Sequence, residues 1–303
     1  MKTAIAIFGY RRPNHLRQVI NSLTTQSVPC QSPVYLFLDG PRRNENSEQV
    51  EACKEIGLEM KQKLPIRIVS SDKNQGLYNS ITTGVTRILG EYERVIVLED
   101  DIVTSPHFLE YMLEGLNCYA ETDRVAAIHA YLPPIKETLP ETFFLRGADC
   151  WGWGTWRDRW SLYRDDAKSM ATEIRKAGLS KAFNLGGRVP NLDLLDACAD
   201  GRSKSWAIRW HASCFLAERY TLHPGRSLVR NIGLDGSGEH CRPSKPLEAV
   251  MSESPIHIAI KAVEENPEIV RAFSRQVAKA PFPVRIYRRL WNAILRKVGN
   301  KGA

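Results

Sequence analysis

The 303-residue sequence lacks the features that define several large protein classes. No apolar run approaches the roughly 20 residues that a membrane-spanning helix needs. The start, MKTAIAIFGYRRPNH, has only about six apolar residues before two arginines, which is too short for a secretory signal. Seven cysteines are scattered without a C-x-x-C pair or a His/Cys cluster, so a structural zinc site is not expected. We therefore expect a cytoplasmic protein with free thiols.

Acidic residues are missing from the end of the chain. Residues 269–303 contain nine Lys or Arg and no Asp or Glu, while the whole chain has a net charge of +8. The remainder is close to neutral, which argues against nucleic-acid binding and for a tail that meets an anionic surface. Residues 283–298 combine apolar positions at helical spacing with arginines, as in a helix lying at the inner face of a membrane. The alternative is a C-terminal helix that is docked on the body of the protein.

Apolar runs alternate with amphipathic stretches in the first half of the chain. Strands are expected at 3–10, 33–40, 66–71, 94–100 and 125–131, and helices at 13–26, 47–63, 76–90 and 105–120. This alternation predicts an α/β fold whose mostly parallel, mixed sheet is covered by helices on both faces. No G-x-G-x-x-G or G-x-x-x-x-G-K-S/T follows any predicted strand, so neither a dinucleotide site nor a P-loop is indicated.

Polar clusters follow four of the predicted strands. Ligands bind at the carboxyl ends of strands in such sheets, so these clusters should meet at one rim. The clusters are Gly9 to Arg12, Asp39, Asn74 to Gly76, and Glu99 to Asp101.

The most unusual of these clusters is the run VIVLEDDI, residues 95–102, in which an apolar strand ends in three carboxylates. Adjacent like charges raise the free energy of the ionised forms. Acidic residues often cap a following helix, but Ser105 and Pro106 already provide a helix start. Mg²⁺ and Mn²⁺ prefer carboxylate oxygens and bridge to substrate phosphates. The cluster therefore predicts a divalent metal that carries a diphosphate.

Three segments resemble a known family. The strand and helix VIVLEDDIVTSPHFLEYM resemble the Golgi N-acetylglucosaminyltransferases that begin complex N-glycans, and their bacterial relatives. The segments WGWGTWRDRW and NIGLDGSGEH are similar to parts of bacterial family-two-like glycosyltransferases. The resemblance covers about residues 3–241. It implies a GT-A fold, the Rossmann-like fold of nucleotide-diphospho-sugar transferases with a D-x-D-type motif.

The resemblance also implies roles for individual residues. Asp101 would ligate the metal, Mn²⁺ or Mg²⁺, while Glu99 and Asp100 would hydrogen-bond the ribose and sugar of the donor. His240 would be a second contact to the metal or the diphosphate, although it could be an ordinary surface-loop histidine. The other donor-site residues would be Gly9, Arg11, Asp39, Asn74 and Gly76.

An inverting transferase needs a base for the acceptor hydroxyl. The resemblance places it in a W-D-x-W-like helix start, but SWAIRW has Ala207 and Ile208 at those positions. Asp149 is the first candidate, and Asp235 and Glu239 are the alternatives. Asp149 could instead hold Arg146 or cap the turn at Gly147.

The tryptophans of the segment WGWGTW are candidate acceptor-binding residues, because sugar rings offer apolar faces that stack on indole. Large apolar side chains usually build the core instead. We expect one or two of Trp151, Trp153 and Trp156 to line the acceptor site and the rest to pack beneath it.

We expect residues 1–245 to form the GT-A domain, with a donor half at 1–131 and an acceptor half at 132–245, followed by a C-terminal extension at 246–303. The expected activity is metal-dependent, inverting transfer of a hexose or N-acetylhexosamine, with UDP as the expected nucleotide, to a surface glycan, polysaccharide or lipid-linked acceptor. One alternative is a sugar nucleotidyltransferase, although FGYRRPNHL lacks its glycines and lysine. The other is a glycan-binding module, which leaves the carboxylate cluster unexplained.

Overall fold

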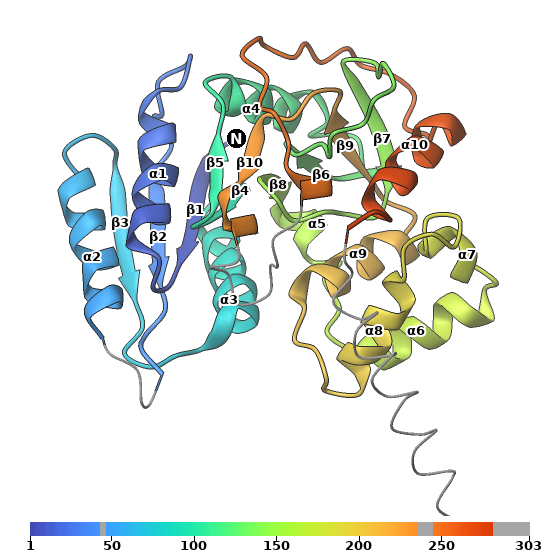
Figure 1. Cartoon of the computed structure of the whole chain (residues 1–303), viewed down its shortest axis with the longest axis horizontal. Helices are drawn as coiled ribbons and strands as arrows, with labels where there is room; N and C mark the ends of the chain where they lie inside the picture. The colour runs from blue at the N-terminus through green and yellow to red at the C-terminus, as the bar shows by residue number, and fades with distance from the viewer. Residues whose placement is uncertain (43–46, 236–244, 281–303) are drawn as a thin grey trace, which may run out of the picture.

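A computed structural model describes residues 1–42, 47–235 and 245–280 of the chain (Figure 1). The strands are β1 (Thr3–Gly9), β2 (Val34–Leu38), β3 (Ile66–Ser70), β4 (Arg94–Glu99), β5 (Ile102–Thr104), β6 (Val125–His129), β7 (Thr142–Arg146), β8 (Trp153–Trp156), β9 (Tyr220–Pro224) and β10 (Val229–Asn231). The helices are α1 (Pro13–Thr24), α2 (Glu48–Met60), α3 (Gly76–Glu91), α4 (Phe108–Cys118), α5 (Arg157–Trp160), α6 (Ala167–Lys176), α7 (Ser180–Phe183), α8 (Asn191–Ala199), α9 (Trp206–Leu216) and α10 (Pro267–Val277), with 3₁₀ turns η1 (Ile232–Asp235) and η2 (Lys245–Leu247).

The centre of the molecule is an eight-stranded sheet in the order β3-β2-β1-β4-β8-β6-β9-β7. Strand β1 pairs in parallel with β2 and β4, and β2 pairs in parallel with β3. Strand β8 runs antiparallel to β4 and β6, so β6 and β9 have the same direction as β4, and β7 closes the sheet antiparallel to β9. The mostly parallel, mixed sheet expected from the sequence is confirmed.

Alternation along the buried strands divides the core into two layers. In β1, Ile5 and Ile7 pack on one face with side chains from α1, α2 and α4. Ala4, Ala6 and Phe8 pack on the other face with side chains from α3, α5 and α9. Because both faces are covered, the parallel strands are continuously apolar and carry their polar residues at their ends.

Two further groups of residues complete the fold. Helices α6, α7 and α8 gather beside α9 at the lower right of Figure 1, around a separate small apolar cluster. Helix α10 packs Ile269 and Phe273 against Phe143 and Leu145 of β7. Helix α10, which lies in the C-terminal extension expected at 246–303, therefore packs directly against the sheet.

The region after the carboxylate cluster differs from the expectation. Helix α4 begins at Phe108, not at Ser105, and the Ser105 hydroxyl accepts a hydrogen bond from the His107 amide at 3.3 Å. The short strand β5 intervenes and pairs antiparallel with β10. This pairing joins segments more than 120 residues apart. Strand β5 therefore lies between the carboxylates and the start of α4.

None of the described helices combines the length and the apolar character that a membrane span requires. The predicted tail helix at 283–298 lies outside the described residues, so its contact with a membrane stays a prediction.

Candidate active site

The carboxyl ends of β1, β2 and β4 bring the predicted donor residues to one rim. The Asp39 amide donates to the Gly9 carbonyl at 3.0 Å, and the parallel register places Phe8 beside Glu99. A Cβ atom on Gly9 would lie 3.5 Å from Cβ of Asp100. Residues that are far apart in the sequence therefore meet where an α/β sheet binds its ligands.

Asp39 joins two parts of this rim. Its Oδ1 accepts from the amides of Gly40 at 2.9 Å and Gln75 at 2.7 Å, and its Oδ2 accepts from the Gly76 amide at 2.8 Å. Asn74 donates from Nδ2 to the Gly40 carbonyl at 2.9 Å. Gly76 has a φ of +76°, a conformation that favours glycine. Asp39 thus holds the start of α3 against β2, and its predicted contact with the nucleotide stays a prediction.

Arg12, the residue before α1, provides positive charge at the carboxylate cluster. Its Nη2 pairs with Oδ1 of Asp100, and its Nη1 lies 3.0 Å from Oδ2 of Asp101. Asp100 Oδ2 also accepts from the Tyr10 amide at 3.3 Å. Burial raises the pKa of Asp101, an effect that Arg12 opposes. The loop after β1 is therefore bound to the end of β4 through one guanidinium.

Glu99 has a different environment from its two neighbours. The residue is half-buried, and its carboxyl group makes no hydrogen bond or ion pair within the part of the chain that the structure describes. Burial, together with the charges of Asp101 and Asp100, raises the pKa of Glu99 to about 8. A carboxyl group that lacks a partner and has a raised pKa is typical of a site built for a positive ligand.

The segment after β10 covers this cluster. The Ile232 amide donates to the Asp101 carbonyl at 2.8 Å, and Asn231 Oδ1 accepts from the Gly233 amide at 2.8 Å. A Cβ atom on Gly233 would come within 2.8 Å of Arg12 Nη1 and still closer to Asp101 Oδ2. Only a glycine leaves room here for the contact between Arg12 and Asp101.

Asp149 lies on the neighbouring loop between β7 and β8. Strand β8 runs antiparallel to β4, so the loop that leads into β8 lies at the same end of the sheet as the carboxyl end of β4. Asp149 is 37% exposed, and its Oδ1 accepts from the Cys150 amide at 2.8 Å. Its Oδ2 makes no hydrogen bond with any described residue, which leaves one carboxylate oxygen free to receive a proton.

A buried pair of histidines contacts the loop between β7 and β8. His129 Nε2 accepts from the Trp151 amide at 3.2 Å, and its Nδ1 lies 3.2 Å from Nδ1 of His223. Burial lowers the pKa of both imidazoles to about 3, so both are neutral at pH 7. Since His129 is neutral, the 4.0 Å separation between its Nε2 and Asp149 Oδ1 is not an ion pair.

Residues 4–137, which carry the donor rim, match the family model described as glycosyl transferase family 2. Over these residues the chain is similar to glycosyl transferase family 2, and its mixed α/β sheet has the arrangement of the GT-A fold.

Several solved structures match parts of this chain. The match to Staphylococcus aureus TarS 1-349 in complex with UDP has 14% identity and a TM-score of 0.36, and covers 55% of this chain and 48% of that one. A Thermus thermophilus structure described as mannose-1-phosphate geranyltransferase has 13% identity, 77% coverage of each chain and a TM-score of 0.38. GalNAc-T7 with UDP, GalNAc and Mn²⁺ has 10% identity and a TM-score of 0.39, over 54% of this chain and 36% of that one. The chain thus spans about half of the length of the TarS fragment that it matches (48%).

The structure separates the three candidate acceptor-binding tryptophans by their burial. Trp153 is fully buried and packs with Trp160, Trp206 and Trp210, while Trp156 donates from Nε1 to the Leu116 carbonyl at 3.1 Å inside the core. Trp153 and Trp156 are thus excluded as acceptor-binding candidates and are among the rings expected to pack beneath the site, because β8 lies in the middle of the sheet and both of its faces are covered. Trp151 is only half-buried, so it alone of the three presents surface near the rim.

One of the two structural alternatives for Asp149, the contact with Arg146, is wrong. Arg146 donates from Nε to the Phe215 carbonyl at 3.0 Å and lies 3.6 Å from Glu218, so it does not hold Asp149.

Some predicted residues cannot be placed. Glu239 and His240 lie outside the described residues, and the side chain of Asp235 is not described. Arg11 lies over the Tyr10 ring, with its guanidinium carbon 5.7 Å from the ring centre.

Sequence reasoning included Arg12 in a rim cluster but assigned the donor role to Arg11, and it missed His129 and His223. Arg12 stands next to Arg11, and nothing in YRRP distinguishes the two side chains. His129 had a usable signal, because it is a polar residue at the end of an apolar strand, as Asp39 and Glu99 are.

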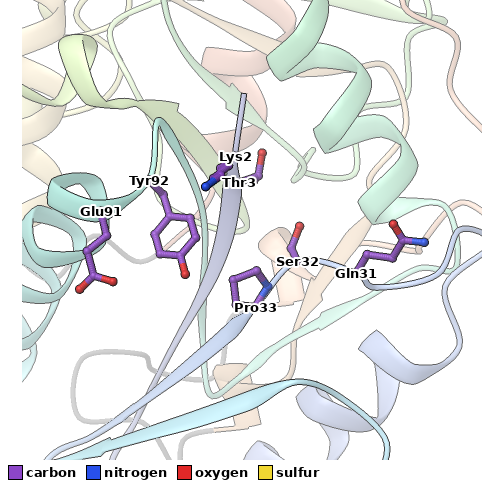
Figure 2. A pocket seen from close by; sticks show the side chains of 7 residues that line it. All are labelled: Lys2, Thr3, Gln31, Ser32, Pro33, Glu91 and Tyr92. Atoms are coloured by element: carbon purple, nitrogen blue, oxygen red, sulfur yellow. The ribbon is translucent and has the colours of Figure 1, made fainter.

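A cavity of about 510 Å³ lies at the opposite edge of the sheet, beside the start of β1 (Figure 2). Its lining residues are Lys2, Thr3, Gln31, Ser32, Pro33, Glu91 and Tyr92. It contains none of the candidate residues and lies at the amino end of β1, away from the carboxylates. The candidate active site is therefore the rim and not this cavity.

The residues at the rim fit a divalent metal. The oxygens of Glu99, Asp100 and Asp101 are the hard donors that Mg²⁺ and Mn²⁺ prefer. Among the described residues, the guanidinium of Arg12 is paired with Asp100 and Asp101, whereas the carboxyl group of Glu99 has no partner. The three carboxylates therefore have less positive charge beside them than they need. Within the described residues no group of three His, Cys, Asp or Glu side chains is arranged to hold a metal ion, so an ion at this rim would need further ligands, such as substrate phosphates.

Proposed function

We propose that this protein is a glycosyltransferase that transfers a hexose or N-acetylhexosamine from a nucleotide diphosphate donor, with UDP as the first nucleotide to test, to a glycan or lipid-linked acceptor. The observation that carries the proposal is the cluster Glu99–Asp100–Asp101 at the carboxyl end of β4, whose three carboxylates are only partly compensated by Arg12. A metal bound there would neutralise charge on the departing diphosphate. Asp101 would hold this metal, with Glu99 and Asp100 facing the ribose and the sugar.

The acceptor half of the reaction is assigned to the adjoining loop. The acceptor oxygen forms a bond to the anomeric carbon while the bond from that carbon to the diphosphate breaks. Asp149 Oδ2 would take the proton of the acceptor hydroxyl, and Trp151 would contact the acceptor ring. Attack from the face opposite the diphosphate makes the transfer inverting.

A screen of donors tests the proposed function. UDP-, GDP- and dTDP-sugars would be incubated with the protein, each with Mn²⁺ and with chelator, while nucleotide release and thermal stability are measured. We expect one nucleotide class to raise the melting temperature and to be hydrolysed only with metal. Stabilisation by a sugar alone, without any nucleotide, would instead indicate a glycan-binding module.

The basic tail leads to a second proposal, attachment to the anionic inner face of the cytoplasmic membrane. Each basic residue near such a surface contributes about 1 kcal/mol, and salt weakens the attachment. A chain that ends before Pro281 should lose binding to phosphatidylserine vesicles and keep donor hydrolysis. Equal vesicle binding with and without the tail would contradict the proposal, and loss of solubility on truncation would favour a docked helix.

A further inference from the structure

Arg12 is placed where it competes with a metal. Its guanidinium bridges Asp100 and Asp101, and its side chain is only 19% exposed. Asp101 is the predicted metal ligand, and its Oδ2 is the oxygen that Arg12 Nη1 approaches to 3.0 Å. The covering segment at Asn231–Gly233 keeps the guanidinium close to this oxygen.

The two positive groups conflict electrostatically. Magnesium binds carboxylate oxygen at about 2.1 Å, so a cation on Asp101 Oδ2 would lie within about 5 Å of the present position of Nη1. Repulsion between a divalent ion and a guanidinium at this distance is strong in a partly buried site. A metal therefore binds weakly unless Arg12 moves away from Asp101 or further negative charge arrives.

We propose that Arg12 is a built-in competitor that keeps the metal affinity of the free enzyme low and couples metal binding to binding of the donor. In the absence of donor, the guanidinium neutralises Asp101. The diphosphate of a donor adds negative charge beside the cluster, so the metal can bind while Arg12 retains Asp100. This inference rests on the proposed function and adds a positioning residue that controls the order of loading.

Linkage makes the proposal measurable. If Arg12 opposes the metal until the diphosphate is present, UDP must raise the affinity for Mn²⁺, and Mn²⁺ must raise the affinity for UDP by the same factor. Removing the guanidinium should tighten binding of Mn²⁺ alone and reduce this factor.

The experiment measures Mn²⁺ affinity of the full chain by electron paramagnetic resonance of the free ion, with and without UDP. The variants are Arg12→Gln, Arg12→Lys and the matched control Arg17→Gln, which removes an exposed arginine of α1 that pairs with Glu59 at 2.8 Å. Arg12→Gln should bind Mn²⁺ alone at least about tenfold more tightly than the wild type, and UDP should add less. Arg17→Gln should match the wild type.

Arg12→Lys keeps the test decisive if Arg12→Gln does not fold, which a thermal melt will show. A lysine has one ammonium group and does not bridge two carboxylates as a guanidinium does. It should bind Mn²⁺ alone more tightly than the wild type and less tightly than Arg12→Gln. Equal Mn²⁺ affinity in the wild type and in the folded Arg12 variants overturns the competitor role but leaves the metal site intact. Absence of Mn²⁺ binding in every protein, even with UDP, overturns both this inference and the metal requirement of the proposed function.

Discussion

Replacing Asp101 with asparagine is expected to reduce sugar transfer by about 10³-fold or more. A metal acting as a Lewis acid contributes several kcal/mol to transition-state stabilisation, and each 1.36 kcal/mol is a factor of ten in rate. The neutral amide of Asp101→Asn would bind a hard cation far more weakly than the carboxylate does. Transfer and Mn²⁺-dependent donor binding should therefore be lost together.

The fold should tolerate this change. Asp101→Asn keeps the size of the side chain beside Gly233, and Arg12 retains its pairing with Asp100. It also removes one of three neighbouring negative charges. The control is Glu59→Gln in the last turn of α2. It removes a carboxylate that is 56% exposed and pairs with Arg17, and that belongs to none of the candidate site residues. This variant should keep full activity and stability within about 0.5 kcal/mol. Full transfer by Asp101→Asn, or unchanged transfer in chelator, would refute the metal assignment.

Replacing Asp149 with asparagine is expected to reduce transfer by a factor of about 10²–10⁴, the usual contribution of a general base. The asparagine Oδ1 can still accept from the Cys150 amide, so the loop should keep its conformation. Its other terminal atom is an amide nitrogen that cannot take a proton from the acceptor. Donor affinity should barely change, because Asp149 would touch only the acceptor.

The measurement for Asp149→Asn separates chemistry from structure. Steady-state transfer, donor affinity and melting temperature are compared with those of Asp200→Asn, which replaces an exposed aspartate that pairs with Arg202 at 2.8 Å. A loss of melting temperature together with activity would indicate a structural role for Asp149. Near-normal turnover in this variant, alongside an inactive Asp235→Asn or Glu239→Gln, would move the base to the segment after β10.

The donor half was largely readable from the sequence. Its strands are continuous apolar runs because both faces of the sheet are covered, and this burial leaves a strong local signal in β1, β2 and β4. Polar residues that interrupt such runs at the strand ends, such as Asp39 and Glu99, therefore indicate the rim from the local sequence alone. The family resemblance then suggested roles for these positions.

The sequence was less informative where contacts are distant. Strand β5 is three residues long and exists through its pairing with β10, so no local pattern predicts it. The same pairing brings Gly233 onto Asp101, which a local pattern does not show.

Two side-chain questions were decided by tertiary structure alone. Three tryptophans next to glycines suggested a sugar site, but β8 inserts between β4 and β6, and this central position buries Trp153 and Trp156. Arg11 and Arg12 are equivalent in sequence, because the period-two alternation of β1 ends at Gly9 and does not fix the direction of the side chains that follow. The chain then enters α1 with Arg12 as the residue before its first turn, and this places the Arg12 guanidinium on Asp100 and Asp101. The local sequence thus determined that carboxylates would gather at the rim, and the path of the backbone into α1 decided which arginine meets them.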